Sequence, residues 1–206
     1  MDLKDALAEG IDGLKLVATD EQQYKLLTLL EQLVKWNKSY NLTAIKDPME
    51  GLTLHLLDSL AVVPFIQQQR ILDVGTGAGF PGLPLAIILP GVQFTLLDSN
   101  SKKIRFIRQQ IHLLALKNVK VIHARVEQPC DERFDGIISR AFASIQDMVQ
   151  MTGHLLEQNG RWLLMKGQYS NQEVSDLSDK VKEIACHQLR VPGLSANRCL
   201  IELQPV

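Results

Sequence analysis

The sequence of 206 residues is short of cysteine, of long apolar runs and of net charge. Its cysteines are odd in number and lack Cys-x-x-Cys spacing, which argues against a disulfide framework or a zinc site. The most apolar stretch, residues 83–89, is interrupted by Pro84 and is too short to cross a membrane. The first residues show no secretory signal, so we expect a soluble, cytoplasmic protein without a metal site. The cysteines are Cys130, Cys186 and Cys199.

The net charge is close to zero, but basic and acidic residues are unevenly distributed along the chain. The chain has 22 Lys+Arg and 23 Asp+Glu, a net charge of −1, whereas nucleic-acid-binding proteins usually carry a basic excess. Residues 99–125, however, contain basic and no acidic side chains, and both flanks are acidic. The segment is either a solvated helix face or a confined RNA-contact surface. Its basic residues are Lys102, Lys103, Arg105, Arg108, Lys117, Lys120 and Arg125.

With 46% hydrophobic and 22% charged residues, the composition is that of one large globular domain, with or without a small helical attachment. The first third predicts helices. Thr19 is a candidate N-cap before an apolar stripe at helical spacing, and Asp47-Pro48 suits a second helix start.

After residue 70, short apolar runs alternate with amphipathic stretches. Alternation of strands and helices predicts an α/β fold with a mainly parallel sheet, and a hairpin around Pro192-Gly193 would add an antiparallel edge. The expected strands are 70–75, 93–98, 119–123, 134–139 and 161–166, followed by hairpin strands at 188–191 and 198–203. The expected helices are 82–89, 102–116, 144–157 and 171–183.

The central motif is the glycine-rich stretch from Asp73 to Gly82, which joins the first strand to a helix. Such a loop lies at the carboxyl edge of the sheet, where α/β proteins bind nucleotides. Alone it also fits a tight turn without a ligand. Asp98 ends the next strand, where an acid accepts hydrogen bonds from ribose hydroxyls, although it could simply cap a helix. Together they indicate an adenosine-containing cofactor.

Two details favour S-adenosylmethionine over a nicotinamide dinucleotide. Asp73 precedes Gly75 by two residues, and an acid there would repel a pyrophosphate but could pair with the cationic methionine amine. Pro81 removes a backbone donor near the helix start, where a pyrophosphate needs N–H groups.

Several further stretches make the sequence resemble class I S-adenosylmethionine methyltransferases, and within them the bacterial 16S ribosomal RNA guanine-N7 methyltransferases of the glucose-inhibited division protein B family. The resemblance covers roughly residues 20–205. The stretches are 35–43 (KWNKSYNLT), 55–59 (HLLDS), 73–84, 139–144 (SRAFAS) and 166–168 (KGQ).

The resemblance implies a Rossmann-like, seven-stranded methyltransferase core at 67–206 with an N-terminal helical extension at 1–66. It also implies that the chain methylates guanine N7 in the small ribosomal subunit or its 16S RNA, and we expect a monomer. The expected cofactor-binding residues are Asp73, Gly75, Gly77, Gly79, Phe80, Asp98, Val126, Glu127 and Arg140.

Four residues are candidates for the reaction itself: Arg140, Lys166, His55 and Asn41. Arg140 and Lys166 end strands at the reacting edge, and a guanidinium suits a carboxylate or a phosphate. The other three residues also have simpler interpretations. His55 could be a structural histidine, Asn41 a turn residue and Lys166 a solvated lysine. Trp36 and Tyr40 could stack on a base, but the spacing of Trp36 favours the core.

Guanine N7 has an in-plane lone pair and no proton, so direct in-line transfer needs no general base. A cation beside N7 would oppose the reaction, so Arg140 is expected to orient ligands without contacting N7. Pro129-Cys130 precedes the fourth strand, where a cytosine-C5 nucleophile would follow it, so a catalytic thiol is not expected. Three alternatives stay open: methylation of another substrate, a dehydrogenase, and a ribosome-associated module without activity.

Overall fold

The computed structural model describes residues 2–128, 131–140, 144–167, 173, 177 and 181–206. One sheet organises the fold, with its strands in the order β3-β2-β1-β4-β5-β7-β6. The first five strands are parallel, and β7 runs antiparallel to both β5 and β6. This confirms the predicted mainly parallel sheet with a terminal antiparallel hairpin. The strands are β1 (Arg70–Val74), β2 (Gln93–Asp98), β3 (Val119–His123), β4 (Phe134–Arg140), β5 (Leu156–Lys166), β6 (Val181–Leu189) and β7 (Arg198–Pro205).

The helices before the sheet begin where the sequence places their caps. Thr19 forms a capping box with Gln22, and the Asp47 carboxylate accepts a hydrogen bond from the backbone of Glu50. The structure adds a first helix that was not among the predicted elements. The elements are α1 (Leu3–Gly13), α2 (Asp20–Tyr40), α3 (Pro48–Gly51), the π-helix η1 (Leu52–Leu57), α4 (Asp58–Leu60) and the 3₁₀ helix η2 (Val63–Phe65).

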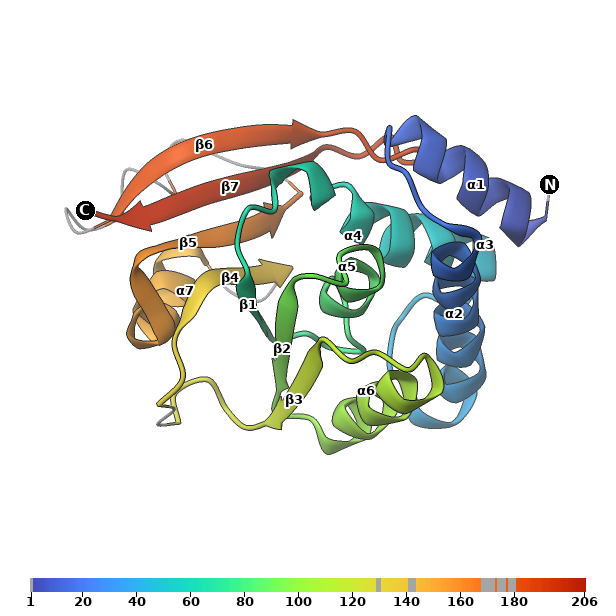
Figure 1. Ribbon diagram of the computed structural model, residues 1–206, viewed down its shortest axis with the longest axis horizontal. Coiled ribbons are helices and arrows are strands. Elements are labelled where there is room, and N and C mark those ends of the chain that lie inside the picture. The colour runs from blue at the N-terminus through green and yellow to red at the C-terminus, as the bar shows by residue number, and fades with distance from the viewer. Residues whose placement is uncertain (1, 129–130, 141–143, 168–172, 174–176, 178–180) are drawn as a thin grey trace.

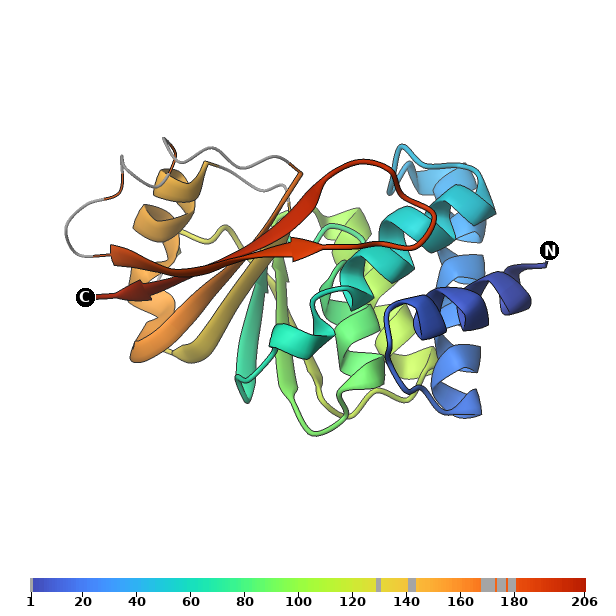
Figure 2. The same ribbon diagram turned by 90° about the horizontal axis from the view of Figure 1, so that it is seen from above.

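The remaining helices cover the two faces of the sheet (Figures 1 and 2). Side chains alternate between the faces along each strand: Ile71 and Ile138 face the cluster under α1–α6, whereas Leu72 and Ile137 face α7. Both faces of the sheet are therefore buried under helices, as is typical of parallel sheets. These helices are α5 (Gly82–Ile88), α6 (Ser101–Leu113), α7 (Ile145–Thr152) and the 3₁₀ helix η3 (Gly153–Leu155).

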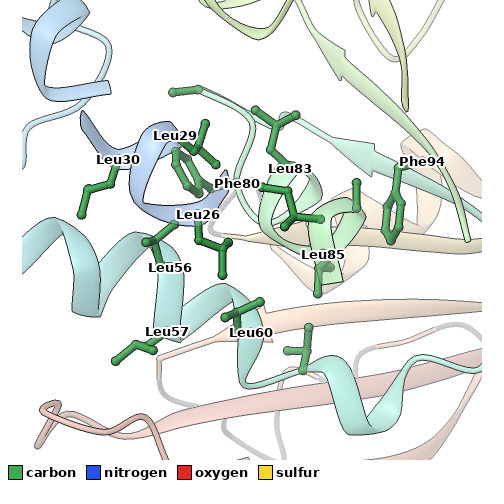
Figure 3. Packing of buried hydrophobic residues seen from close by; sticks show 14 of the residues in the cluster. Leu26, Leu29, Leu30, Leu56, Leu57, Leu60, Phe80, Leu83, Leu85 and Phe94 are labelled. Carbon is green, nitrogen blue, oxygen red and sulfur yellow. The ribbon is translucent and has the colours of Figure 1, made fainter. Parts of the chain in front are cut away.

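The helices of residues 1–66 share one hydrophobic cluster with the sheet face (Figure 3). Leu26 and Leu29 of α2 pack with Leu83 of α5, and the Gln22 amide donates to the carbonyls of Ile87 and Ile88. Among the described residues, none of the helices combines the length and apolarity needed to cross a membrane.

Four predicted elements have wrong boundaries near the C-terminus: the helices 144–157 and 171–183 and the strands 161–166 and 188–191. The helix expected at 144–157 stops at Thr152, and β5 starts already at Leu156. Residues 181–183 of the helix expected at 171–183 belong to β6, which extends the predicted hairpin strand backwards from residue 188. Pairing with β7 determines where β6 begins, because the charged, half-exposed residues of this edge strand show no clear alternation of apolar and polar side chains.

Candidate active site

A tight loop joins β1 to α5, and its first residue, Gly75, lines a pocket at this edge of the sheet. The backbone N–H groups of Gly75 and Thr76 donate to the Leu97 carbonyl at 2.9 and 3.1 Å, which fastens the loop to β2. Gly77 and Gly79 have φ angles of 63° and 94°, a left-handed region that favours glycine. Only glycine fits this loop without strain.

Asp73 lies beneath this loop and is fully buried. Its Oδ2 atom accepts hydrogen bonds from Thr76 Oγ1 at 2.6 Å and from the Gly82 N–H at 2.8 Å. Its Oδ1 atom has no hydrogen-bond partner within the part of the chain that the structure describes. Burial raises the pKa of Asp73 to about 6, against the hydrogen bonds from Thr76 and Gly82 that lower it. Asp73 thus holds the loop and keeps one acceptor atom available.

Asp98 ends β2 next to the loop. Its Oδ2 atom accepts from the Gly77 N–H at 2.9 Å, and Oδ1 accepts from the Asn100 N–H at 2.8 Å. Each oxygen keeps acceptor capacity for a further donor. Asp98 borders a pocket of about 330 Å³. The pocket is lined by Gly75, Leu97, Asp98, Ser99, Lys103, Ala124, Arg125, Val126 and Glu127.

This cofactor pocket brings together four of the predicted cofactor-binding residues, Gly75, Asp98, Val126 and Glu127. Val126 is buried and supplies an apolar wall, whereas Glu127 is exposed. Lys103 from the basic segment also borders it, so this basic side chain belongs to a pocket and not to an open helix face.

A second pocket of about 330 Å³ opens where β4, β5 and β7 meet the π-helix η1. A π-helical turn is rare and often marks a functional site. This target pocket contains His55, Arg140 and Lys166 of the predicted reaction residues, and shares no lining residue with the cofactor pocket. It is lined by Ile45, Leu54, His55, Asp58, Arg140, Met165, Lys166, Gly167 and Arg198.

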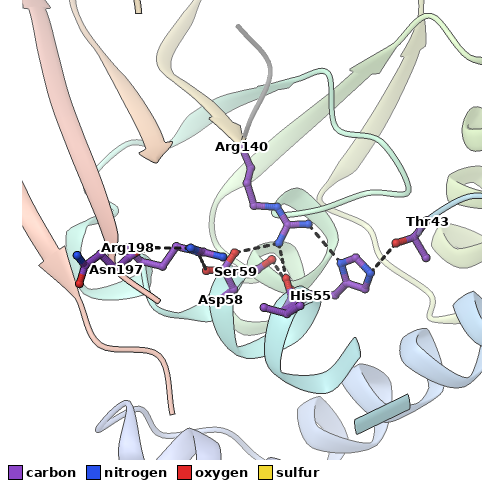
Figure 4. A network of polar contacts seen from close by, with 8 residues as sticks. Thr43, His55, Asp58, Ser59, Arg140, Asn197 and Arg198 are labelled. Atoms are coloured by element: carbon purple, nitrogen blue, oxygen red, sulfur yellow. Dashed lines mark hydrogen bonds and ion pairs between the residues drawn. The ribbon is translucent and has the colours of Figure 1, made fainter. Parts of the chain in front are cut away.

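Arg140 is the centre of a polar network in the target pocket (Figure 4). Its Nη1 atom donates to the Leu54 carbonyl at 2.7 Å and to Asp58 Oδ2 at 3.1 Å, and its Nη2 atom lies 3.4 Å from His55 Nδ1. All three partners come from η1 and the residue that follows it. The network therefore couples the last residue of β4 to the helices that precede the sheet.

His55 is neutral in this network. Burial, followed by the nearby Arg140 charge, lowers the pKa of His55 to about 4. Because a guanidinium only donates, Nδ1 must accept, and the proton resides on Nε2. Nε2 then donates to Thr43 Oγ1 at 3.0 Å. Both nitrogens of the imidazole are engaged within the protein.

Phe80 connects the two pockets. It belongs to the glycine loop, is buried, and stacks on His55 with a centroid distance of 4.7 Å and an interplanar angle of 24°. The Arg140 guanidinium carbon lies 5.7 Å from the Phe80 ring centroid, within reach of a cation–π interaction. Through Phe80, the glycine loop is therefore in direct contact with two residues that line the target pocket.

Asp58, Arg198 and Thr43 are residues of this network that the sequence did not single out. Asp58 Oδ1 accepts from Arg198 Nε at 3.0 Å, while Oδ2 accepts from Arg140. An acid inside the leucine-rich stretch 52–60 was the available signal, because a buried carboxylate needs charged or hydrogen-bonding partners. Nothing in the local sequence indicated that the partners lie 82 and 140 residues away.

Of the other residues singled out in the sequence, Lys166 lines the target pocket, whereas Asn41 and Trp36 lie outside both pockets. Lys166 ends β5, lines the target pocket and forms an ion pair with Glu173 at 3.6 Å. Asn41 ends α2 in a left-handed conformation, is exposed and lines neither pocket. Trp36 packs edge-on against Phe106 at the margin of the core, as expected. Cys130, residues 141–143 and Gln168 lie outside the described residues.

The sheet order, the reversed β7, the glycine loop after β1 and the acid that ends β2 define a class I S-adenosylmethionine-dependent methyltransferase. The fold is similar to coclaurine N-methyltransferase bound to N-methylheliamine and S-adenosylhomocysteine, with a TM-score of 0.60 and 16% identity over 90% of this chain and 71% of that chain. It is also similar to a ribosomal protein L11 methylase from Lactobacillus delbrueckii subsp. bulgaricus, with a TM-score of 0.56 and 14% identity over 72% and 76% of the two chains.

The family model of rRNA small subunit methyltransferase G matches residues 22–201, and the chain belongs to this family. It is 50% identical to ribosomal RNA small subunit methyltransferase G of Aeromonas salmonicida, over 93% of this chain and 92% of the relative. The chain is also 45% identical to ribosomal RNA small subunit methyltransferase G of Psychromonas ingrahamii, over the full length of both chains.

The pockets fit S-adenosylmethionine, the cofactor of this class. Asp98 offers acceptor capacity to ribose hydroxyls, and the buried Asp73 Oδ1 is an unpaired acceptor suited to an ammonium group. This agrees with the expected cofactor, and membership of the rRNA small subunit methyltransferase G family confirms the expected methyltransferase over the alternative of a dehydrogenase.

Proposed function

We propose that the protein methylates N7 of a specific guanine in 16S ribosomal RNA, with the RNA or the assembled small subunit as its partner. Relatives that share about half of its residues over nearly the whole chain carry the name ribosomal RNA small subunit methyltransferase G. The target pocket supplies an independent argument for the nucleophile, because it lacks an available general base among the residues that the structure describes.

His55 and Asp58 are the imidazole and carboxylate candidates for a general base among the described residues that line the target pocket, and the Lys166 amine forms an ion pair with Glu173. His55 uses both ring nitrogens within the protein, and each Asp58 oxygen accepts from an arginine. S-adenosylmethionine supplies an electrophilic methyl group. A nucleophile that must lose a proton would lack an acceptor here, whereas guanine N7 attacks with a lone pair and requires only correct placement.

The remaining residues place the reactants. The glycine loop with Asp73 and Asp98 would hold the cofactor. Arg140 and Lys166 would orient the guanine nucleotide through O6 or phosphate and stay away from N7, where a cation would oppose the positive charge of the product. His55 shapes the pocket as a neutral hydrogen-bonded ring. The role of Asn41 stays a prediction, since its place at the end of α2 equally suits a turn residue.

An RNA substrate must present the guanine unstacked, because a stacked base cannot meet a methyl group in line. The exposed side chains of Lys102, Arg105 and Arg108 on α6 would contact the RNA backbone next to the cofactor pocket. Ribosomal RNA as substrate implies action in the cytoplasm, and we propose that the enzyme acts as a monomer.

The deciding experiment incubates the protein with labelled S-adenosylmethionine and small subunits that lack the modification. We expect one methyl group per particle, mapped to N7 of a single guanine. Parallel reactions with naked 16S RNA show which form is the substrate. Label on another atom or on a ribosomal protein would overturn the proposal, and bound cofactor without any transfer would favour an inactive ribosome-associated module.

Arg140→Lys tests the assignment of roles. Arg140 reaches its three partners from two separate nitrogen atoms, a spread that the single nitrogen of a lysine does not reproduce, so ligand placement should loosen. We expect turnover to fall by about 10- to 100-fold together with a raised KM for the RNA. Normal cofactor and RNA binding combined with complete loss of turnover would instead assign Arg140 to the chemical step.

A further inference from the structure

One buried carboxylate in the target pocket holds two arginines that are far apart in the sequence. Asp58 is 3% exposed, and its two oxygens accept separately, one from Arg140 at 3.1 Å and the other from Arg198 at 3.0 Å. Arg140 is the last residue of β4, and Arg198 is the first residue of β7. Figure 4 shows both guanidinium groups converging on this carboxylate.

Neither arginine exhausts its donors in this arrangement. A guanidinium has five N–H groups. Arg140 uses Nη1 for Leu54 and Asp58 and Nη2 for His55, while Arg198 uses Nε for Asp58 and Nη1 for the Asn197 carbonyl. In the contacts made by the described residues, donors of both groups therefore remain for a ligand, and the carboxylate between them keeps the two side chains at a fixed separation.

The pocket around them has the character of a nucleotide site. Three basic side chains, Arg140, Arg198 and Lys166, have two carboxylate partners, Asp58 and Glu173, so the polar wall keeps an excess of positive charge. The same lining also includes the apolar side chains of Ile45, Leu54 and Met165. An apolar surface beside paired guanidinium groups suits a base on one side and its phosphate on the other.

The cofactor carboxylate is the other anion that the arginines could bind. The pocket that contains Asp98 and the glycine loop shares no lining residue with the target pocket, and Arg198 comes from the far side of β5 relative to that loop. The observations favour an anion of the RNA.

We propose that Arg140 and Arg198 form a binding subsite for a backbone phosphate of the RNA, and that Asp58 is the positioning residue that holds them at the required separation. The inference rests on the proposed function, because it assumes an RNA substrate. It adds a ligand class for the pocket, a role for Arg198 and a role for Asp58.

The first test replaces Arg198 with Gln and measures methyl transfer to undermethylated small subunits at several salt concentrations. We expect the KM for the subunits to rise about tenfold and the slope of log KM against log salt to fall by about 0.7–0.9. The affinity for S-adenosylmethionine should stay unchanged. Arg161→Gln is the matched control, because Arg161 also pairs with a buried carboxylate, Glu202, but lies outside the target pocket.

An unchanged KM and salt slope would remove the phosphate subsite. Loss of cofactor affinity with an intact salt slope would assign the arginines to the cofactor carboxylate and overturn the inference. A second probe avoids the particle altogether: guanosine monophosphate should inhibit the wild-type enzyme more strongly than guanosine, and Arg198→Gln should abolish that difference.

The second test, Asp58→Asn, separates positioning from simple neutralisation. The amide removes a negative charge, so a carboxylate that only neutralises the pocket would leave kcat intact and tighten RNA binding. A positioning role predicts a kcat at least about tenfold lower without tighter binding. Asp58→Glu, which keeps the charge, should restore part of kcat, and a wild-type-like kcat in Asp58→Asn would refute the positioning role.

Folding of the variants is checked by cooperative thermal unfolding, and Arg198→Lys provides a milder change if Asp58→Asn does not fold. The wild-type mapping experiment keeps the two proposals apart. If the wild type methylates no RNA, the proposed function fails. If it methylates RNA but Arg198→Gln keeps the wild-type salt slope, the phosphate subsite alone fails.

Discussion

The cofactor pocket and the target pocket are built in opposite ways. The cofactor pocket comes from residues 75–127, with a glycine loop, the end of β2 and the turn after β3 following one another along three adjacent parallel strands. The target pocket gathers residues from 45 to 198, and its central carboxylate, Asp58, meets arginines 82 and 140 residues away. Both have volumes of about 330 Å³.

The two pockets also differ in what their charged groups require. At the glycine loop, Asp98 of the cofactor pocket and the buried Asp73 accept hydrogen bonds from hydroxyl and N–H groups of the loop itself. In the target pocket, Asp58 and Arg140 satisfy each other across elements. Local motifs suffice to build the cofactor pocket, whereas the pocket in which we propose that the guanine binds depends on the complete tertiary structure.

Breaking the cofactor loop should have the largest effect. A Cβ at Gly79 would lie 2.4 Å from Leu83 Cδ1, and the φ of 94° is unfavourable for any other residue. We expect Gly79→Ala to cost about 3 kcal/mol of stability and most of the cofactor affinity. Gly91→Ala, where a Cβ meets nothing within 4 Å, is the control, with chemical denaturation and cofactor titration as measurements. Equal stability of both variants would contradict the account.

Acid should weaken the target pocket through His55. The folded-state pKa of about 4 lies below the ordinary 6.5, so the unfolded chain binds the proton more tightly. The His55 contribution is complete above about pH 6.5, falls as the pH drops, and has lost about 3 kcal/mol near pH 4. Urea unfolding of wild type and His55→Asn should therefore show a stability difference that shrinks with falling pH. A difference that is constant from pH 7 to 4 would contradict the buried neutral imidazole.

The cofactor pocket should respond to pH through a different residue. Asp73 has a pKa of about 6, and a cationic amine binds best to its ionised form. Cofactor affinity should thus rise with pH through about 6 and level off above it, and Asp73→Asn should lower the plateau about tenfold and flatten the profile. Calorimetric titration between pH 5 and 8 measures both, and a pH-independent wild-type affinity would exclude the contact between Asp73 and the amine.

The smallest expected effect concerns the basic face of α6, outside both pockets. Arg105 and Arg108 are exposed, and Arg105 lies over the Tyr40 ring at 6.0 Å. Replacing Lys102 and Arg108 with Gln should reduce the salt slope of RNA binding by about one for each phosphate that the variant no longer neutralises, with little change in kcat. Filter binding at several salt concentrations measures the slope, and an unchanged slope assigns these side chains to solvent.

Sequence patterns predicted the elements that carry strong local signals. The glycine loop, Asp98, the Thr19 cap and five parallel strands are all present, because turn chemistry and strand burial act within a few residues. The boundaries of α7 and β6 were missed, since pairing of β5 with β4 and of β6 with β7 determines them. Asp58 lies inside a stretch that is typical of the family. Its role, however, depends on Arg140 and Arg198, which no sequence pattern places next to it.

The class of protein follows from the amino-acid sequence alone, because short-range rules for turns, caps and strand burial define the sheet and its cofactor loop, and the motifs define the family. The assembly of the target pocket follows only from the folded chain. A buried carboxylate is tolerable only when opposite charges reach it, and the partners of Asp58 reach it because the end of β4 and the start of β7 lie beside the π-helix.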